Sequence, residues 1–260
     1  MPEFAKSSDG TPIAYDRVGH GPALIIVGGA FNTRLSPYPL VPLLAERFTV
    51  FSYDRRGRGE SGTGNDEAET VPREVEDLAA VITAAGGSAM VYGHSSGAIL
   101  SLEAAMAGVP ISRIAVFEPP YSFDPEHPEP GEDFGFPAAI AAGDRDAAAR
   151  AFLQITGMPA AAVAGMSAAP WWPGMITSAL TLSHDIALTG DGRVPGDRLG
   201  AVVVPVLALD GGDSPPWAAR ASRGVASAVI AGTRRTVEGQ DHGVDQTVLA
   251  PILAEFFAIA

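Results

Sequence analysis

Short runs of Val, Ile, Leu and Phe bounded by Gly or Pro alternate along the chain with longer Ala-rich stretches. The short runs have the length of strands and the Ala-rich stretches have helical character, an alternation typical of a mostly parallel sheet flanked by helices. We predict strands at residues 13–18, 23–27, 49–53, 89–92, 113–117, 202–209 and 234–237. The clearest helices are predicted at residues 71–85, 97–107, 216–227 and 248–258.

The alternation breaks off in one long segment, residues 119–195. This segment begins with a Pro-rich acidic loop and continues through Ala-rich helical pieces that contain Trp171 and Trp172. We predict a helical cap inserted into a single domain, whose core is formed by residues 1–118 and 196–260. The two indoles could form the roof of a binding cavity or fill the core of the cap itself, and the sequence leaves both interpretations open.

Composition and charge narrow the classes of function. The 260 residues are 47% hydrophobic and 18% charged, and no apolar run approaches the roughly 18 residues that a membrane-spanning helix needs. The N-terminus shows no secretory signal, so we expect a cytoplasmic protein without a membrane partner. A net charge of −13 with no long basic block argues against nucleic acid as a partner. The absence of Cys excludes disulfides, thiolate nucleophiles and cysteine metal sites.

A G-x-S-x-G pattern at residues 93–97 connects a predicted strand to a predicted helix. So tight a turn forces its central residue, Ser95, into a strained backbone conformation and requires small residues two positions before and two positions after it, which Gly93 and Gly97 supply. The strain lifts the Ser95 hydroxyl above the sheet, and the free N–H groups at the start of the helix face developing negative charge. We therefore predict Ser95 as a nucleophile and the Ser96 N–H as an oxyanion donor.

With this motif in place, the chain resembles the α/β-hydrolase superfamily over nearly all of its length outside the insertion. The resemblance implies a mostly parallel eight-stranded sheet flanked by helices, with a helical cap. Residues 25–31 occupy the place of the family's strand-ending His-Gly-x segment, whose last residue supplies the second oxyanion N–H; this role falls on Ala30. Gly28 replaces the family's His. The next residue, Phe31, is assigned to the substrate pocket together with Trp171 and Trp172.

Two further segments resemble family motifs. Residues 54–62 are similar to the D-x-R-G-x-G-x-S turn, which implies a structural role in bracing the loops beneath the active site. Ser61 in this turn is not a candidate nucleophile, because no helix begins behind it. His242 lies between the last predicted strand and the last predicted helix, where the family places its catalytic base. His94 is expected to point away from the nucleophile, and a substrate contact is left open for His184.

The acid of the triad departs from the family pattern. A carboxylate on the second ring nitrogen of the base fixes its tautomer and stabilises the imidazolium. The family's usual acid position holds Ser214. We favour Glu118, which directly follows the strand predicted at residues 113–117, a location that resembles a subset of haloalkane dehalogenases. Asp213 is the main alternative, through a one-residue shift of its loop, and Asp210 and Asp124 are further candidates.

The resemblance implies a carboxylic ester hydrolase that cleaves a small-molecule ester or lactone through an acyl-enzyme on Ser95. A Ser nucleophile also leaves open cleavage of C–C bonds or a non-hydrolytic reaction in a biosynthetic pathway, because one fold hosts many chemistries. A catalytically weak ligand-binding protein is a third interpretation. The sequence contains no metal motif and no dinucleotide or phosphate-binding fingerprint, so no cofactor or metal is expected. The expected partner is a small-molecule substrate, and a homo-oligomer is left open.

Overall fold

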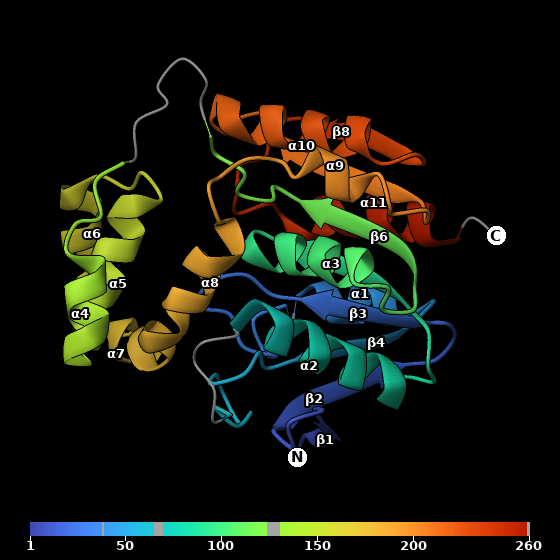
Figure 1. Ribbon diagram of the computed structural model, residues 1–260, viewed down its shortest axis with the longest axis horizontal. Coiled ribbons are helices and arrows are strands. Elements are labelled where there is room, and N and C mark those ends of the chain that lie inside the picture. Colours follow the sequence, from blue (N-terminus) through green and yellow to red (C-terminus); the bar gives the residue numbers. More distant parts are fainter. Residues whose placement is uncertain (38, 65–69, 124–130, 259–260) are drawn as a thin grey trace.

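Eight strands form a single sheet at the centre of the protein (Figure 1). The computed structural model describes residues 1–37, 39–64, 70–123 and 131–258. The strand order in the sheet is β1-β2-β4-β3-β5-β6-β7-β8. Strand β2 pairs antiparallel with both of its neighbours, β1 and β4, and all other neighbouring strands pair parallel. The strands are β1 (Glu3–Lys6), β2 (Pro12–Gly19), β3 (Ala23–Val27), β4 (Thr49–Tyr53), β5 (Ala89–His94), β6 (Ile111–Phe117), β7 (Val206–Gly211) and β8 (Gly232–Val237).

The structure confirms the expected eight-stranded, mostly parallel sheet. Strand β1 was not located from the sequence, because only Ala5 of its four residues is buried and no apolar run marks it. Strand β7 begins four residues later than predicted. Pro205 directly precedes it and lacks the N–H that a ladder position requires, so the apolar residues from Val202 onward lie in the preceding loop.

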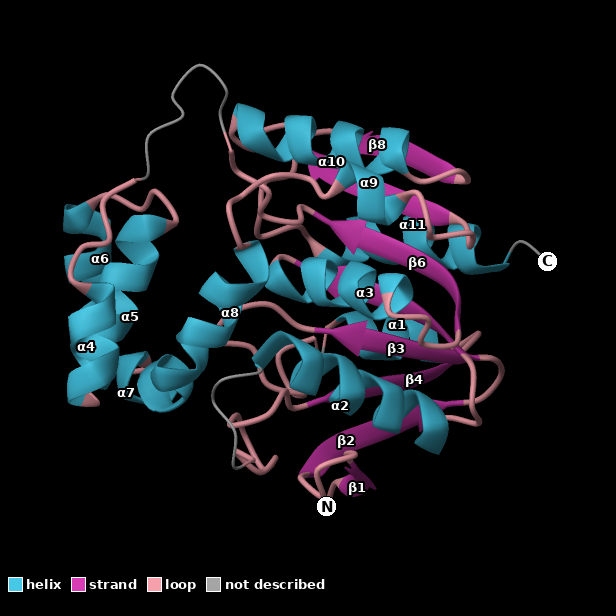
Figure 2. Cartoon of the chain, in the orientation of Figure 1, coloured by secondary structure: helices cyan, strands magenta, loops and turns pink. Residues whose placement is uncertain are grey.

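Helices cover both faces of the sheet (Figure 2). Alternate residues of β3 point to opposite faces, so Ile25 and Val27 pack in one core cluster and Leu24 and Ile26 in the other. The first cluster is completed by residues of α2 (Thr70–Ala84), α3 (Ser96–Met106) and α10 (Pro216–Ala228). The second is completed by residues of α1 (Leu40–Ala45) and α11 (Gln246–Ala258).

A group of helices separates β6 from β7. In Figure 1 helices α4 to α7 lie beyond the carboxyl ends of the parallel strands, and α8, which contacts α2 and α3, lies between them and the sheet. Helices α4 to α8 share a core of their own that includes Phe136, Phe152, Trp172 and Leu182, whereas Leu199 of the last helix of the group packs in the first cluster. The helices of the group are α4 (Phe136–Ala142), α5 (Arg145–Ile155), α6 (Ala160–Ser167), α7 (Trp172–Met175), the 3₁₀ helix η1 (Ile176–Thr181), α8 (Leu182–Thr189) and α9 (Gly196–Leu199). No helix in the described ranges is both long and apolar enough to span a bilayer.

Gly97 allows α3 to pack directly on the end of β3. A Cβ at this position would lie 2.2 Å from the carbonyl oxygen of Val27 and 2.7 Å from that of Gly28. Both atoms are backbone, so neither can move without shifting the strand. We expect Gly97→Ala to lower the free energy of unfolding by about 1–3 kcal/mol, the usual cost of overpacking. Urea denaturation monitored by circular dichroism measures the change.

Gly165→Ala is the matched control for this prediction. Gly165 lies inside α6, and a Cβ there would meet no atom within 4 Å. Removing a glycine from a helix interior is expected to stabilise the protein by about 0.5–1 kcal/mol. Equal effects of the two substitutions would contradict the packing argument at Gly97.

Candidate active site

The predicted sharp turn is present between β5 and α3. Ser95 has φ 56° and ψ −126°, a conformation that non-glycine residues rarely adopt. Hydrogen bonds on both sides hold it in this geometry: the Ser95 N–H donates to the Phe117 carbonyl at 2.9 Å, and the Ser95 carbonyl accepts from the Ala98 N–H at 2.9 Å. The Ser95 side chain is half-buried at the edge of the sheet where the parallel strands end.

Backbone strain gathers at this edge, where three of the four non-glycine residues with positive φ in the described ranges lie; the fourth, Phe134, precedes α4. Phe31, Ser95 and Glu118 have φ values of 60°, 56° and 47°. Ser95 directly follows β5, Glu118 directly follows β6, and Phe31 lies in the short loop after β3. The strands concerned, β3, β5 and β6, are neighbours in the sheet. Such residues cost about 1–3 kcal/mol each and cluster at functional sites. The strain therefore marks the carboxyl ends of these three strands as the candidate site.

His242 and Glu118 form the central polar contact of the site. His242 Nδ1 lies 2.7 Å from Glu118 Oε2, and the Gly211 N–H donates to Glu118 Oε1 at 2.8 Å. The Glu118 carboxylate is fully buried, whereas 45% of the His242 side chain is exposed. With Nδ1 engaged by the carboxylate, Nε2 is the ring nitrogen available to accept a proton.

The environment of Glu118 favours its ionised form. Burial by itself raises the pKa of this carboxyl, but the hydrogen bonds from His242 and from the Gly211 N–H, together with the adjacent Ser214 hydroxyl, lower the pKa below its usual value. The Ser214 hydroxyl lies close enough to the carboxylate to lower its pKa, although its geometry is not that of a hydrogen bond. This hydroxyl has no hydrogen-bond partner among the described residues. Ser214 occupies the position where the family's usual acid was expected.

The other acid candidates lie elsewhere. Asp210 is buried at the end of β7, and its two carboxylate oxygens accept from Arg234 Nε and Nη2, each at 2.7 Å. Asp213 is exposed, and in the described part of the chain its side chain makes no hydrogen bond or ion pair. Asp124 falls outside the described residues. Of the candidates that the structure describes, only Glu118 contacts His242.

His94 contacts the same histidine from the other side. Its side chain was expected to point away from the nucleophile, but a contact with the predicted base was not foreseen: its ring stacks on Phe117 and lies 4.9 Å from the His242 ring, centroid to centroid. Burial lowers the pKa of His94 to about 4, with the neighbouring His242 as a further cause. A neutral ring 2.9 Å from the His242 carbonyl oxygen must donate its Nε2 proton to it. Adjacency to Ser95 was the only sequence signal for this contact.

The depressed pKa of His94 predicts acid-dependent stability. Between pH 6.5 and about 4 the unfolded chain binds a proton that the folded protein refuses, so this contribution to stability falls as the pH falls. On lowering the pH from 7 to 5, the parent is expected to lose about 2 kcal/mol more of its free energy of unfolding than His94→Gln. Urea titrations at both pH values measure the loss. The exposed His20 supplies the control variant, His20→Gln, which should behave as the parent; equal losses for the parent and His94→Gln would refute the assignment.

The loop after β3 lies close against the nucleophile. A Cβ on Gly29 would be 2.8 Å from Ser95 Cβ, so only glycine fits. The backbone N–H groups of Ala30 and Ser96 have no hydrogen-bond acceptor among the described residues. Within the same ranges Ser95 Oγ is not hydrogen-bonded to His242, a bond that often forms fully only in the substrate complex.

The three residues predicted to line a pocket have different environments. Phe31 makes an edge-to-face contact with Phe152 of α5, with ring centroids 5.6 Å apart. This contact connects the loop after β3 to the helices between β6 and β7, called the inserted helices below. Trp172 is buried in the core of these helices and donates its indole N–H to Asp146 at 2.7 Å. Trp171 is 52% exposed. Trp172 therefore has the environment of a core side chain, the second of the two interpretations that the sequence left open.

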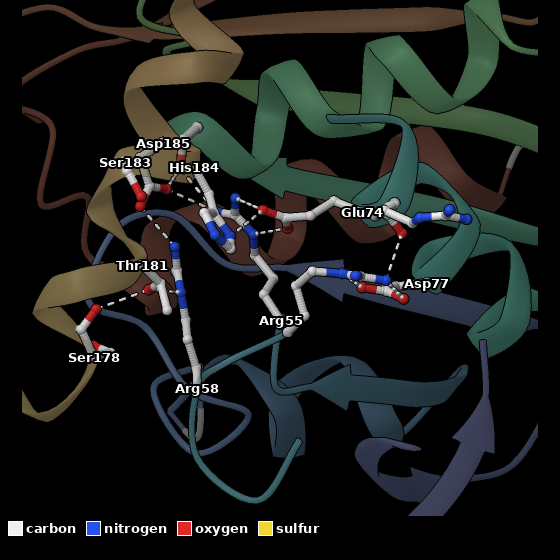
Figure 3. A network of polar contacts seen from close by, with 12 residues as sticks. Arg55, Arg58, Glu74, Asp77, Ser178, Thr181, Ser183, His184 and Asp185 are labelled. Carbon is white, nitrogen blue, oxygen red and sulfur yellow. Dashed lines mark hydrogen bonds and ion pairs between the residues drawn. The ribbon is translucent and has the colours of Figure 1, made fainter. Parts of the chain in front are cut away.

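A cluster of buried charges lies near the site (Figure 3), where Arg58 donates to the Gly29 carbonyl of the loop after β3. We call Arg55, Arg58, Glu74 and Asp185 the buried ion cluster; each of these side chains is at most 2% exposed. His184, for which a substrate contact was left open, instead has its Nδ1 3.5 Å from Glu74 Oε1. The cluster joins the turn at residues 54–62 to α2 and α8.

In the described part of the chain, no group of three or more His, Cys, Asp or Glu side chains is arranged to hold a metal ion. The chemistry that the geometry offers is that of a hydroxyl on a strained turn, an imidazole with one ring nitrogen engaged by an ionised carboxylate, and unpaired backbone N–H groups nearby.

Comparisons with known proteins agree with this architecture. The model of the alpha/beta hydrolase family matches residues 19–248. The crystal structure of an alpha/beta hydrolase from Sphaerobacter thermophilus DSM 20745 is 46% identical, with a TM-score of 0.91 over 98% of this chain and 100% of that one. The esterase RhEst1 from Rhodococcus sp. ECU1013 shares the fold at 20% identity, with a TM-score of 0.72 over 99% of this chain and 98% of that one.

Curated relatives match over shorter stretches. The uncharacterized hydrolase YraK of Bacillus subtilis is 34% identical over 98 residues, which make up 36% of this chain and 35% of YraK. The chain therefore spans about a third of the length of this relative.

Proposed function

The chain belongs to the α/β hydrolase family, and we propose that it is a serine hydrolase that cleaves a small-molecule ester or lactone through an acyl-enzyme on Ser95. The observation that carries this proposal is the 2.7 Å contact between His242 Nδ1 and the buried Glu118 carboxylate. Ser95 is held on its strained turn at the same edge of the sheet, where its N–H donates to the carbonyl of Phe117, the residue before Glu118. This is the arrangement that activates a hydroxyl for attack on a carbonyl carbon.

In the first half of the reaction His242 Nε2 takes the proton of the Ser95 hydroxyl as its oxygen attacks the substrate carbonyl. Glu118 keeps the other proton of the ring on Nδ1 and stabilises the imidazolium that forms. It can do so because its own pKa is lowered, so the carboxylate is ionised at neutral pH. His94 holds the carbonyl of His242, which supports the position of the ring.

The negative charge of the tetrahedral intermediate is bound by the N–H groups of Ala30 and Ser96. The positive end of α3, which begins at Ser96, adds to this stabilisation. His242 then passes its proton to the leaving alcohol as the C–O bond breaks. Water attacks the acyl-enzyme with His242 again as the base, which releases the acid and restores the Ser95 hydroxyl.

The surroundings favour an uncharged acyl group of modest size. We propose that the helices between β6 and β7 act as a cap over the site, because their hydrophobic core packs against Ala30 and Phe31. The nearest buried cations, Arg55 and Arg58, are already paired with carboxylates and are not available to bind an anionic substrate. An apolar roof above cations that are already paired suits a neutral ester or lactone.

A substrate panel tests the proposal. Short p-nitrophenyl esters, aliphatic lactones and aryl diketones are offered at equal concentration, and the intact mass of the protein is recorded during turnover. We expect hydrolysis of an ester or a lactone and a transient mass increase equal to the acyl group. Turnover of the diketones alone would replace the proposal with hydrolysis of a C–C bond, and turnover of none of the panel would favour a binding function.

A further inference from the structure

The buried ion cluster reaches the backbone of the site through Arg58. Its guanidinium donates from Nη2 to Asp185 Oδ2 at 2.6 Å, from Nε to Thr181 Oγ1 at 3.0 Å, and from Nη1 to the carbonyl oxygen of Gly29 at 2.6 Å. Asp185 and Thr181 belong to the inserted helices (Figure 3). One fully buried side chain thus joins the insertion to the loop after β3.

The Gly29 carbonyl and the Ala30 N–H are the two ends of one peptide group. The peptide group is planar and trans, so the direction of its carbonyl fixes the opposite direction of its N–H. A cation hydrogen-bonded to the oxygen also draws electron density from the amide and makes its N–H a stronger donor, most of all where water is excluded.

The loop needs such an external hold. Glycine is required at position 29 because any Cβ would collide with Ser95, and glycine permits more backbone conformations than any other residue. Its neighbour Gly28 is also a glycine, and its carbonyl accepts a long hydrogen bond from Arg55 Nη1 at 3.4 Å. Within the loop itself, the Gly29 carbonyl accepts only a longer hydrogen bond, from the Asn32 N–H at 3.3 Å, among the described residues. The 2.6 Å bond from Arg58 is shorter and charge-assisted, so it is the stronger constraint on the direction of the Ala30 N–H.

The residue that carries the second expected oxyanion donor, Ser96, is hydrogen-bonded to the buried ion cluster. The Ser96 hydroxyl donates to Asp185 Oδ1 at 2.5 Å and accepts from Arg55 Nη1 at 3.1 Å. Asp185 therefore accepts hydrogen bonds both from Arg58, which holds the Ala30 amide, and from Ser96, which carries the other amide.

We propose that Arg58 is a positioning residue that orients and polarises the Gly29–Ala30 peptide, so that the Ala30 N–H binds the oxyanion of the reaction. Asp185 and Thr181 hold Arg58 in place, and the inserted helices thereby contribute to the chemistry without touching the reacting atoms. This inference rests on the proposed function, because it needs an oxyanion on the carbonyl attacked by Ser95.

The test compares Arg58→Met with Arg56→Met. Arg56 lies in the same turn, is equally buried and pairs with Asp77 at 2.7 Å, but in the described part of the chain it forms no hydrogen bond or ion pair with the loop after β3. With p-nitrophenyl butyrate, we expect Arg58→Met to lower kcat by about 10- to 100-fold with little change in KM. The inhibition constant of an alkyl trifluoromethyl ketone, whose adduct with serine carries the oxyanion, is expected to rise by a similar factor. Arg56→Met should leave both values near those of the parent.

A charge-balanced pair of variants covers the case in which Arg58→Met does not fold. Arg58→Met with Asp185→Asn removes one buried charge of each sign, and its control is Arg56→Met with Asp77→Asn. The same loss of kcat and of inhibitor affinity is expected in the first double variant and not in the second.

The outcomes separate the two claims. If the parent hydrolyses the ester and a folded Arg58 variant matches its Arg56 control in kcat and inhibitor affinity, the role of Arg58 is overturned and the proposed function stands. If the parent neither hydrolyses p-nitrophenyl esters nor reacts with a fluorophosphonate probe, the proposed function fails and the role of Arg58 falls with it.

Discussion

Replacing Ser95 with Ala is expected to abolish ester hydrolysis, with a fall in kcat of about five to six orders of magnitude toward the background rate. The hydroxyl on the strained turn is the only group of the protein that forms a covalent bond to the substrate in the proposed mechanism. The same substitution is expected to remove all labelling by a fluorophosphonate probe. Initial rates with a p-nitrophenyl ester and the intact mass of the probe-treated protein measure the two effects.

Ser61→Ala is the control for this experiment. Ser61 lies in the turn at residues 54–62, where its hydroxyl accepts from the Ala14 N–H at 2.8 Å and donates to the Asp54 carbonyl at 2.7 Å. Its loss is expected to affect stability and to leave labelling intact. Labelling of a folded Ser95→Ala variant to the same extent as the parent would show that another residue is the nucleophile.

Replacing Glu118 with Gln is expected to lower kcat by about two to four orders of magnitude, by analogy with loss of the triad carboxylate in other serine hydrolases. The amide keeps the shape of the side chain and removes its charge. It also offers an N–H₂ group to the ring, which favours the tautomer in which Nε2 carries the proton and cannot accept one from Ser95. Steady-state kinetics with the best ester of the panel measure the loss.

Asp213→Asn is the matched control, because it makes the same chemical change on an exposed carboxylate in the loop that carries Ser214. It is expected to keep near-parental activity, and circular dichroism establishes that both variants are folded. A large loss in Asp213→Asn with none in Glu118→Gln would reverse the assignment of the acid.

Much of the fold follows from local sequence signals. The buried runs at β3, β4 and β6 are continuous because helices cover both faces of the sheet, so each of them could be located from hydrophobicity alone. The turn around Ser95 could be predicted because its steric demand for glycine is met within five consecutive residues. Strand β1 has one buried position and no comparable signal.

The environment of individual side chains could be predicted less well from the sequence. The direction of the His94 ring depends on the loop that carries His242, which is 148 residues away. Whether Trp172 lines a cavity or fills a core depends on how the helices between β6 and β7 pack. Both answers require contacts that leave no pattern in the neighbouring sequence.

By itself, therefore, the sequence determined the class of fold, the strained turn at Ser95 and the place of His242 after the last strand, because each of these depends on residues close together in the chain. Only the tertiary structure decided which carboxylate meets His242, since Glu118 and His242 are 124 residues apart and the choice depends on the order of β6, β7 and β8 in the sheet. It also brought Asp185 to Arg58 across 127 residues. A buried charge must find a partner of opposite sign, but that requirement does not say where in the chain the partner lies.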